Sequence, residues 1–286
     1  MTTCFFISDL HGKSSRYHSL FRAILLERPT AVFLGGDIMP GFSAYIRRQQ
    51  EHKDFLGDFL RPQMFKLKDA MGEDYPRIFI ILGNDDGRQV EAEILQLEDE
   101  GIWEYLHFRR RELAGYNIFG YSFVPPTPFR LKDWEKYDVS RYVDPGCLSP
   151  EEGAYTVDLP LQEKCNSTIA LDLGKLLSSE DLAKSVFLFH SPPYNTSLDR
   201  AALDGKMVDQ IPLDVHVGSI AIRRMIETLQ PVLTLHGHIH ESSRLTGQWR
   251  ENIGRTHCFS AAYDGPELAL IKFHLEKPEK AIRVLI

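Results

Sequence analysis

Short apolar segments that end near a glycine and are followed by polar side chains recur along this sequence, and they restrict the folds open to the chain. The first three cover residues 3–8, 31–34 and 76–82, and helical patterns follow them. The first helical pattern places apolar residues at i, i+3, i+4 and i+7 from Tyr17, with Ser14 or Ser15 as its expected cap. Buried strands that alternate with helices predict βαβ units and a largely parallel sheet, in an α/β fold.

The polar residues after these three strands are of types that bind metal ions. Asp9 and His11 follow the first strand, Asp37 follows the second and Asn84 follows the third. Ligand sites in parallel sheets lie beyond the carboxyl ends of the strands. We therefore expect these four side chains to gather at one edge of the sheet.

Two later strands end in histidine. His190 follows an apolar run at 186–189, and a second run at 232–235 leads into Leu-His-Gly-His-Ile-His, residues 235–240. Side chains alternate along extended backbone, so His238 and His240 are expected to point the same way. Three histidines within five residues, directly after a buried strand, favour a metal site over a surface or core cluster.

The remaining segments complete a single domain over residues 1–286. Residues 103–108 and 117–121 are expected to form a hairpin, and strands are expected near the C-terminus. Residues 124–178 are rich in Pro, Asp, Glu and Tyr and have weak periodicity, which indicates an insertion over the site or a surface excursion without a role. Ser219 is expected to cap a helix at 220–230, whose N-terminus is either an anion site or an ordinary capped end.

Composition excludes several classes of protein. The net charge of −7 argues against a basic surface for duplex nucleic acid, and no apolar stretch approaches the roughly 20 residues that span a bilayer. The four cysteines are scattered, which fits a reducing compartment. The N-terminus does not have the pattern of a signal peptide. These features predict a cytoplasmic protein without a membrane partner, for which a homo-oligomer stays open.

The strand ends together offer seven ligands, which are too many for one tetrahedral ion with an open position. Imidazole with carboxylate suits Mn, Fe, Zn or Ni. Two ions that share one carboxylate would clamp the attacking and leaving oxygens of an in-line displacement. The pattern therefore predicts metal-assisted hydrolysis, with a phosphate ester as the leading substrate class. The seven ligands are Asp9, His11, Asp37, Asn84, His190, His238 and His240.

The order and type of these blocks resemble the calcineurin-like metallophosphoesterases. The matching blocks are Asp9-x-His11, Gly36-Asp37, Gly83-Asn84, His190 and Gly237-His238-x-His240. The resemblance implies a four-layer α/β/β/α sandwich with two ions at the strand ends. It implies that Asp9, His11 and His240 bind the first ion, that Asn84, His190 and His238 bind the second, and that Asp37 bridges them. Residues 191–194 and 217–219 are similar to a small prokaryotic-type branch of the family.

One position departs from the family pattern. Most members have Gly-Asn-His at the third block, where the histidine assists the leaving group or holds the phosphate, whereas this chain has Asp85. A carboxylate beside two cations should be ionised and would be a poor acid. His107, His216 and His236 are candidate replacements, and His216 is preferred because it lies in the loop before a helix.

The resulting expectation is a dinuclear metal-dependent phosphohydrolase, in which a metal-bridging hydroxide attacks a phosphate ester in line. A small-molecule or nucleotide phosphodiester is the expected substrate. A phosphomonoesterase or a phosphoprotein phosphatase is the alternative within the enzyme class. A weakly active or non-catalytic metal-binding scaffold is the alternative outside it, because Asp85 replaces the usual histidine.

Overall fold

The computed structural model describes residues 1–41, 52–177 and 182–286. Its described strands form two six-stranded sheets and one small hairpin. The strands of the first sheet are β1 (Thr3–Ile7), β2 (Ala31–Gly35), β3 (Arg77–Ile81), β4 (Glu104–Tyr105), β13 (Ala269–His274) and β14 (Lys277–Leu285). Those of the second are β5 (Arg109–Leu113), β6 (Tyr116–Tyr121), β7 (Ser185–Phe189), β10 (Leu233–His236), β11 (Arg250–Ile253) and β12 (Thr256–Ser260). The small hairpin pairs β8 (Met207–Val208) with β9 (Ile211–Pro212).

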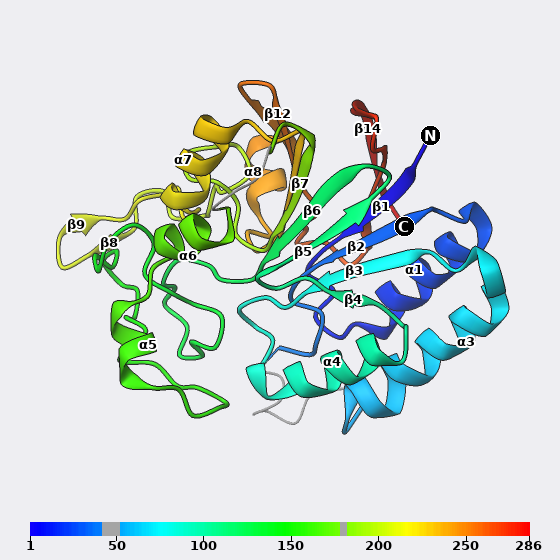
Figure 1. Ribbon diagram of the computed structural model, residues 1–286. Coiled ribbons are helices and arrows are strands. Elements are labelled where there is room, and N and C mark those ends of the chain that lie inside the picture. The colour runs from blue at the N-terminus through cyan, green and yellow to red at the C-terminus, as the bar shows by residue number, and fades with distance from the viewer. Residues whose placement is uncertain (42–51, 178–181) are drawn as a thin grey trace.

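Parallel pairing dominates the centre of each sheet, as the sequence predicts. The first sheet has the order β14-β13-β1-β2-β3-β4 and the second β11-β12-β10-β7-β6-β5 (Figure 1). Strands β1 to β4 are parallel, and so are β6, β7, β10 and β12. Among the described strands, antiparallel pairing lies toward the edges of the two sheets.

Helices cover the outer faces of the sheets. The longer ones are α1 (Ser14–Glu27), α3 (Arg61–Met71), α4 (Glu91–Asp99), α6 (Ile169–Leu176) and α7 (Ile220–Leu229). Figure 1 shows α1, α3 and α4 beside the first sheet and α6 and α7 beside the second. The shorter ones are the π-helix η1 (Phe55–Leu60), η2 (Gly72–Asp74), η3 (Arg88–Val90), α5 (Leu161–Asn166), η4 (Leu182–Lys184) and α8 (Ser242–Thr246).

The core follows from the period of two along buried strands. In β1, Cys4 and Phe6 belong to the apolar cluster between the two sheets, which also contains Leu235 of β10. Phe5 and Ile7, the alternate residues of the same strand, belong to the cluster under the helices. A strand buried on both faces reads as a continuous apolar run, which is why these segments stand out in the sequence. The four-layer α/β/β/α sandwich is confirmed.

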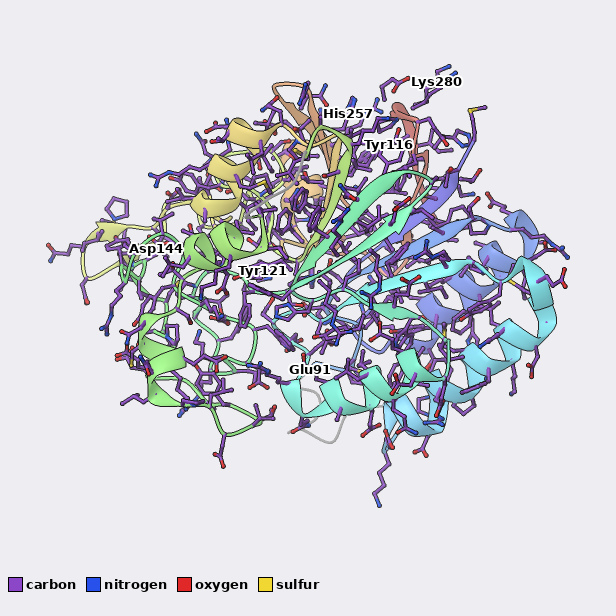
Figure 2. All side chains as sticks on the ribbon, in the orientation of Figure 1. Glu91, Tyr116, Tyr121, Asp144, His257 and Lys280 are labelled. Carbon is purple, nitrogen blue, oxygen red and sulfur yellow. The ribbon has the colours of Figure 1, made fainter. Side chains whose placement is uncertain are left out.

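Side chains fill the molecule between the ribbons (Figure 2). Tyr121, at the end of β6, is fully buried and donates its hydroxyl to Asp172 of α6 at 2.9 Å. Phe33 and Phe79 stack between the sheets with ring centroids 5.2 Å apart. Among the described helices, none is both long enough and apolar enough to cross a membrane.

Two local predictions were wrong. The hairpin to β6 begins at Arg109, not at residue 103, because β4 pairs with β3 in the other sheet. Helix α1 is preceded by Lys13, whose side chain makes no capping hydrogen bond, so neither serine caps it. The helical pattern expected after the second strand is present, as a π-helix from Phe55 continued by α3.

The segment predicted as an insertion, residues 124–178, ends in α5 and α6. It contacts the loop after β3 through two backbone donors: the N–H of Arg88 donates to Asp133 at 2.7 Å, and that of Gln89 donates to Thr156 at 3.0 Å. Asp138 in the same segment contacts the start of α7. Its status as an insertion, and a single domain over the whole chain, stay predictions.

Candidate metal centre

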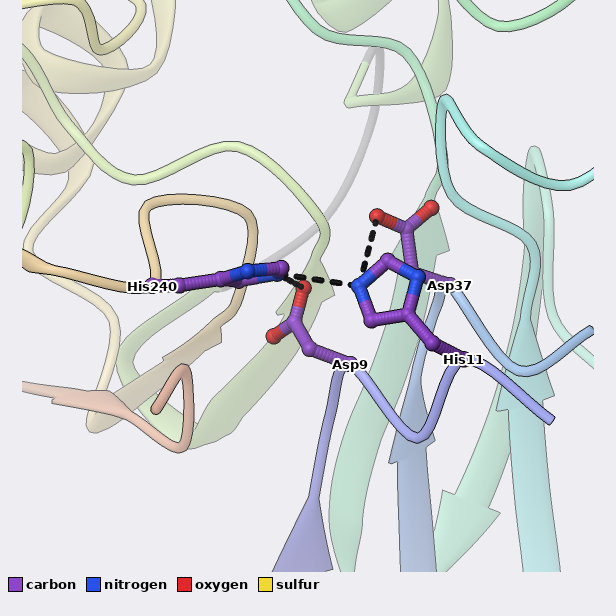
Figure 3. A group of neighbouring side chains, drawn as sticks. All are labelled: Asp9, His11, Asp37 and His240. Carbon is purple, nitrogen blue, oxygen red and sulfur yellow. Dashed lines mark hydrogen bonds and ion pairs between the residues drawn. The ribbon is translucent and has the colours of Figure 1, made fainter. Parts of the chain in front are cut away.

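Side chains from the ends of five strands meet where the two sheets face each other. Asp9 and His11 follow β1, Asp37 follows β2 and His240 follows β10, and Figure 3 shows these four converging. Their potential ligand atoms all lie within 4.8 Å of one another. Asp9 and Asp37 are buried, with exposed fractions of 1% and 3%. Two buried carboxylates pointing at one place need a positive charge between them.

A second group adjoins the first and shares Asp37 with it. The ligand atoms of Asp37, His190 and His238 also lie within 4.8 Å of one another. His190 Nε2 is 3.3 Å from Asp37 Oδ2 and 3.1 Å from the amide oxygen of Asn84. Asn84 therefore belongs to this second group, and the structure brings all seven predicted ligands together.

The backbone turns sharply where the strands deliver these ligands. Asp9, His11, Asp37 and His238 have φ angles of 58°, 48°, 51° and 75°. This left-handed region is uncommon for residues other than glycine, although Asp and His adopt it more readily than most. Residues held there gather at functional sites, where the surrounding structure imposes the conformation.

Histidines 238 and 240 do not point the same way. Strand β10 ends at His236, and the positive φ of His238 breaks the alternation. His240 Nε2 lies 3.1 Å from Asp9 Oδ1, in the first group, whereas the His238 ring lies 5.2 Å from that of His190, in the second. The extended-backbone prediction was wrong, and the turn sends the two imidazoles to different groups.

Glycines provide the close approach of the loops. A Cβ added at Gly83 would overlap the Asp37 carboxylate and lie 2.6 Å from His190 Nε2. A Cβ at Gly237 would overlap Ser8 and lie 2.7 Å from Asp9 Oδ2. Glycine before Asn84 and before His238 is therefore required by contact with the ligands.

The donor set fits divalent cations. His11 Nε2 and His240 Nε2 face each other at 3.0 Å, and at most one of them can donate a hydrogen to the other. With metal–nitrogen bonds of about 2.1 Å, neighbouring ligands around one ion lie roughly 3.0 to 3.4 Å apart. Nitrogen and oxygen donors without a thiolate suit Mn, Fe, Zn or Ni.

Charges inside the cluster already shift the protonation equilibria. Burial opposes ionisation of Asp9, but the hydrogen bond and charge of His240 outweigh it and lower the pKa of Asp9 to about 2. Burial likewise opposes ionisation of Asp37, yet the charge of His190 holds the pKa of Asp37 well below its usual range. Burial and the charge of His190 lower the pKa of His238 to about 3, so this imidazole is neutral at neutral pH and keeps the lone pair of one ring nitrogen available.

The histidines proposed as substitute acids lie in different surroundings. His216 Nδ1 is 2.8 Å from the buried carboxylate of Asp199. His236 is fully buried, with its ring nitrogens at hydrogen-bonding distance from the Ser191 carbonyl and the Thr234 hydroxyl. His107 accepts from the N–H of Ser122 at 3.1 Å.

The start of α7 is capped by Ser219, and the carboxylate of Asp138 occupies the position where an anion could bind. Ser219 caps it as predicted and accepts from the N–H of Ile222. The carboxylate of Asp138 accepts the Ser219 hydroxyl and the N–H of Ile220, each at 2.6 Å. The chain's own carboxylate thus takes the place that a bound anion would need.

Asp86 is a residue that supports the candidate site and that sequence reasoning missed. It is fully buried, and its carboxylate accepts the backbone N–H groups of Met39 at 2.7 Å, Gly83 at 2.8 Å and Ile38 at 3.2 Å. It thereby ties the loop carrying Asp37 to the loop carrying Asn84. A second acid directly after Asp85 was the available signal.

A family of known proteins matches most of this chain. The sequence model of the calcineurin-like phosphoesterase family matches residues 2–242 of this chain.

The chain belongs to the calcineurin-like phosphoesterase family.

Solved structures extend the likeness of fold to almost the whole chain. TT1561 of Thermus thermophilus has a TM-score of 0.55 and 16% identity, over 99% of this chain and 98% of that one. A dimetal phosphatase from Danio rerio has a TM-score of 0.52 and 13% identity, over 94% and 91%. Phosphopantetheinyl hydrolase from Mycobacterium tuberculosis has a TM-score of 0.51 and 12% identity, over 91% and 89%.

A curated relative matches more closely over a short segment. It is the uncharacterized protein MJ1162 of Methanocaldococcus jannaschii, 41% identical over 72 residues, which are 24% of this chain and 29% of that protein. The predicted membership of a family of metal-dependent phosphoesterases is confirmed, and placement in its small prokaryotic-type branch stays a prediction.

Proposed function

We propose that this protein is a hydrolase that cleaves phosphate esters with two divalent ions. The observation that carries the proposal is Asp37, whose carboxylate belongs to both ligand groups. Asp9, His11 and His240 complete the first group, and Asn84, His190 and His238 complete the second. When bound, the two ions would lower the pKa of a water and neutralise charge on the phosphate.

The chain's own residues prepare this site. Nδ1 of His190 is 2.8 Å from the carbonyl oxygen of Gly35, so a hydrogen on Nδ1 leaves the lone pair of Nε2 facing Asp37 and Asn84. Backbone N–H groups of Asp85 and His238 donate to Asp37 and Asp9, which orients both carboxylates. Preorganised ligands of this kind spare the reaction the cost of rearranging them.

A phosphodiester is the proposed substrate class. Asp85 lies at the rim of the centre with 35% of its side chain exposed, and no family histidine stands there to hold a phosphate. A phosphomonoester carries up to two negative charges at neutral pH, whereas a diester carries one. The Asp85 carboxylate therefore repels a monoester more strongly than a diester.

His216 is the proposed acid for the leaving alcohol. Its partner Asp199 is fully buried and also accepts the backbone N–H groups of Asn195, Thr196 and Gly218, so it cannot turn away easily. With Nδ1 held by Asp199, Nε2 is the nitrogen available for proton transfer.

Assays with two p-nitrophenyl esters test the proposal. The metal-free protein would be supplied with Mn, Ni or Zn and given bis-p-nitrophenyl phosphate or p-nitrophenyl phosphate. Turnover of the diester above that of the monoester is expected. If neither ester is hydrolysed with any of the three ions, the proposed hydrolase is contradicted.

A non-catalytic metal-binding scaffold is the second candidate, and the replacement of the family histidine by Asp85 is the observation that favours it. A scaffold of this kind would bind two ions per chain but hydrolyse no ester. An Asp85→His variant that gained hydrolysis would instead show a weakened enzyme.

A further inference from the structure

The residue that breaks the family pattern contacts a metal ligand. Oδ2 of Asp85 is 3.3 Å from Nδ1 of His11. On its other side, the His11 ring presents Nε2 to His240 Nε2 at 3.0 Å and to Asp37 Oδ2 at 3.8 Å. His11 therefore lies between the Asp85 carboxylate and the first ligand group.

This geometry selects one tautomer of His11. A neutral imidazole carries its hydrogen on one nitrogen and a lone pair on the other. An ionised carboxylate can only accept, so the hydrogen belongs on Nδ1, beside Asp85. The lone pair of Nε2 then faces the first group, where an ion would bind.

The structure holds Asp85 in place for this contact. Its backbone N–H donates to Asp37 Oδ1 at 2.8 Å, which sets the position of the loop. Gly41 lies against the Asp85 carboxylate, and a Cβ added at Gly41 would overlap Oδ2. One residue thus positions Asp37 through its backbone and His11 through its side chain.

The two ligand groups differ in how their histidines are oriented. In the second group, Nδ1 of His190 faces the backbone carbonyl of Gly35. In the first group, the partner of His11 is the carboxylate of Asp85. A carboxylate raises the basicity of a ligating imidazole as well as fixing its ring, and loss of such a partner weakens metal binding.

We propose that Asp85 is a positioning residue that orients His11 toward the ion of the first group and strengthens the binding of that ion. This assignment of Asp85 rests on the proposed two-metal centre. Asp85 thus occupies the sequence position of the family histidine, but it does not protonate the leaving group or hold the phosphate.

Titration of the metal-free, full-length protein with Co²⁺ tests the assignment without any substrate. Calorimetry gives the affinities of the two ions, and visible absorption reports the ligand geometry of each. In Asp85→Ala, one of the two ions should bind roughly tenfold to a hundredfold more weakly, with an altered absorption band, while the other is unchanged. Asp85→Asn keeps an oxygen acceptor without the charge and should fall between Asp85→Ala and the wild type.

Glu93→Ala is the matched control, because Glu93 is an exposed acid that lines the same cavity of about 270 Å³ as Asp85. It should leave both affinities unchanged. Equal urea-unfolding curves of the metal-free proteins would establish that each variant folds.

Two results would overturn the assignment. Unchanged Co²⁺ affinities and spectra in Asp85→Ala would mean that Asp85 does not act through His11. An equal loss in Glu93→Ala would mean that only the total negative charge matters. Failure of the wild type to bind two ions would instead contradict the two-metal centre itself, so the two failures are distinguishable.

Discussion

At the scale of single residues, the three candidate replacements for the family histidine differ in their hydrogen-bond partners. His216 is paired with a buried carboxylate, whereas His236 and His107 hydrogen-bond inside the fold. A buried carboxylate that holds one ring nitrogen leaves the other for proton transfer. His216 therefore remains the proposed acid, and His107 is a histidine whose substitution should affect stability.

Substitution of His216 should reveal its role through the leaving group. In His216→Gln, hydrolysis of a diester with an alkyl leaving group should fall about a hundredfold, since a positioned acid contributes at least that much. Hydrolysis of bis-p-nitrophenyl phosphate should change little, because p-nitrophenolate leaves without a proton. Steady-state kcat for both esters measures this, and His257→Gln, on β12, is the control. Equal losses of kcat for both esters would contradict His216 as the acid for the leaving alcohol.

The pH dependence of stability should carry a contribution from His107. Burial, with the nearby charges of Lys136 and Arg88, lowers the pKa of His107 to about 3, against about 6.5 in the unfolded chain. Between these values the unfolded chain binds a proton that the folded chain does not, so stability falls as pH falls. From pH 7 to 5.5, the metal-free wild type should lose about 1 kcal/mol more than His107→Gln. Urea unfolding at the two pH values measures this difference in stability. Equal losses of stability in the wild type and in His107→Gln would contradict the contribution of His107.

At the scale of elements, helix α7 depends on a residue far away in the chain. Asp138 lies 82 positions before Ile220, whose backbone N–H it accepts. The carboxylate satisfies helix N–H groups that otherwise lack a partner, and its charge is favourable at the positive end of the helix. The same contact attaches the predicted insertion to the second sheet's helical layer.

Removal of this carboxylate should therefore destabilise the protein without affecting the metal centre. In Asp138→Ala the free energy of unfolding should fall by about 1–2 kcal/mol, and Asp138→Asn should lose less because it keeps an acceptor. Asp144→Ala, an exposed acid of the same segment, should be neutral. Urea unfolding with excess metal is the measurement, and equal stability of Asp138→Ala and Asp144→Ala would refute the contribution.

At the scale of the whole molecule, the proposed metal centre joins the two sheets. Asp9, Asp37 and Asn84 come from the first sheet, and His190 and His240 come from the second. An ion bound by both would connect the layers in addition to the apolar cluster between them. Ions that bind only the folded chain stabilise it by mass action.

Chelation should consequently lower the melting temperature. At a metal concentration one hundred times the dissociation constant, one ion contributes about 2.7 kcal/mol that EDTA would remove. Asp37→Asn, which loses the shared carboxylate, should show a smaller difference between metal and EDTA. Its activity should fall roughly a thousandfold or more, because charge stabilisation by the ions is worth several kcal/mol. A melting temperature that does not respond to metal in the wild type would contradict a centre built into the fold.

The sequence by itself determined the α/β class, the central strands and the seven candidate ligand side chains that the structure gathers. Strands buried on both faces are continuous apolar runs, and parallel sheets place ligands at strand ends, so both signals are local in the chain. Family membership followed from the same blocks. These signals need only neighbouring residues and the period of the backbone.

Only the tertiary structure decided how those ligands are divided and held. The turn at His238 separates it from His240, the Asp85 carboxylate faces His11, and Asp138 takes the helix end that could have bound an anion. His11 and His240 meet across 229 positions of the sequence. Contacts between residues so far apart depend on the packing of the two sheets, which no local pattern encodes.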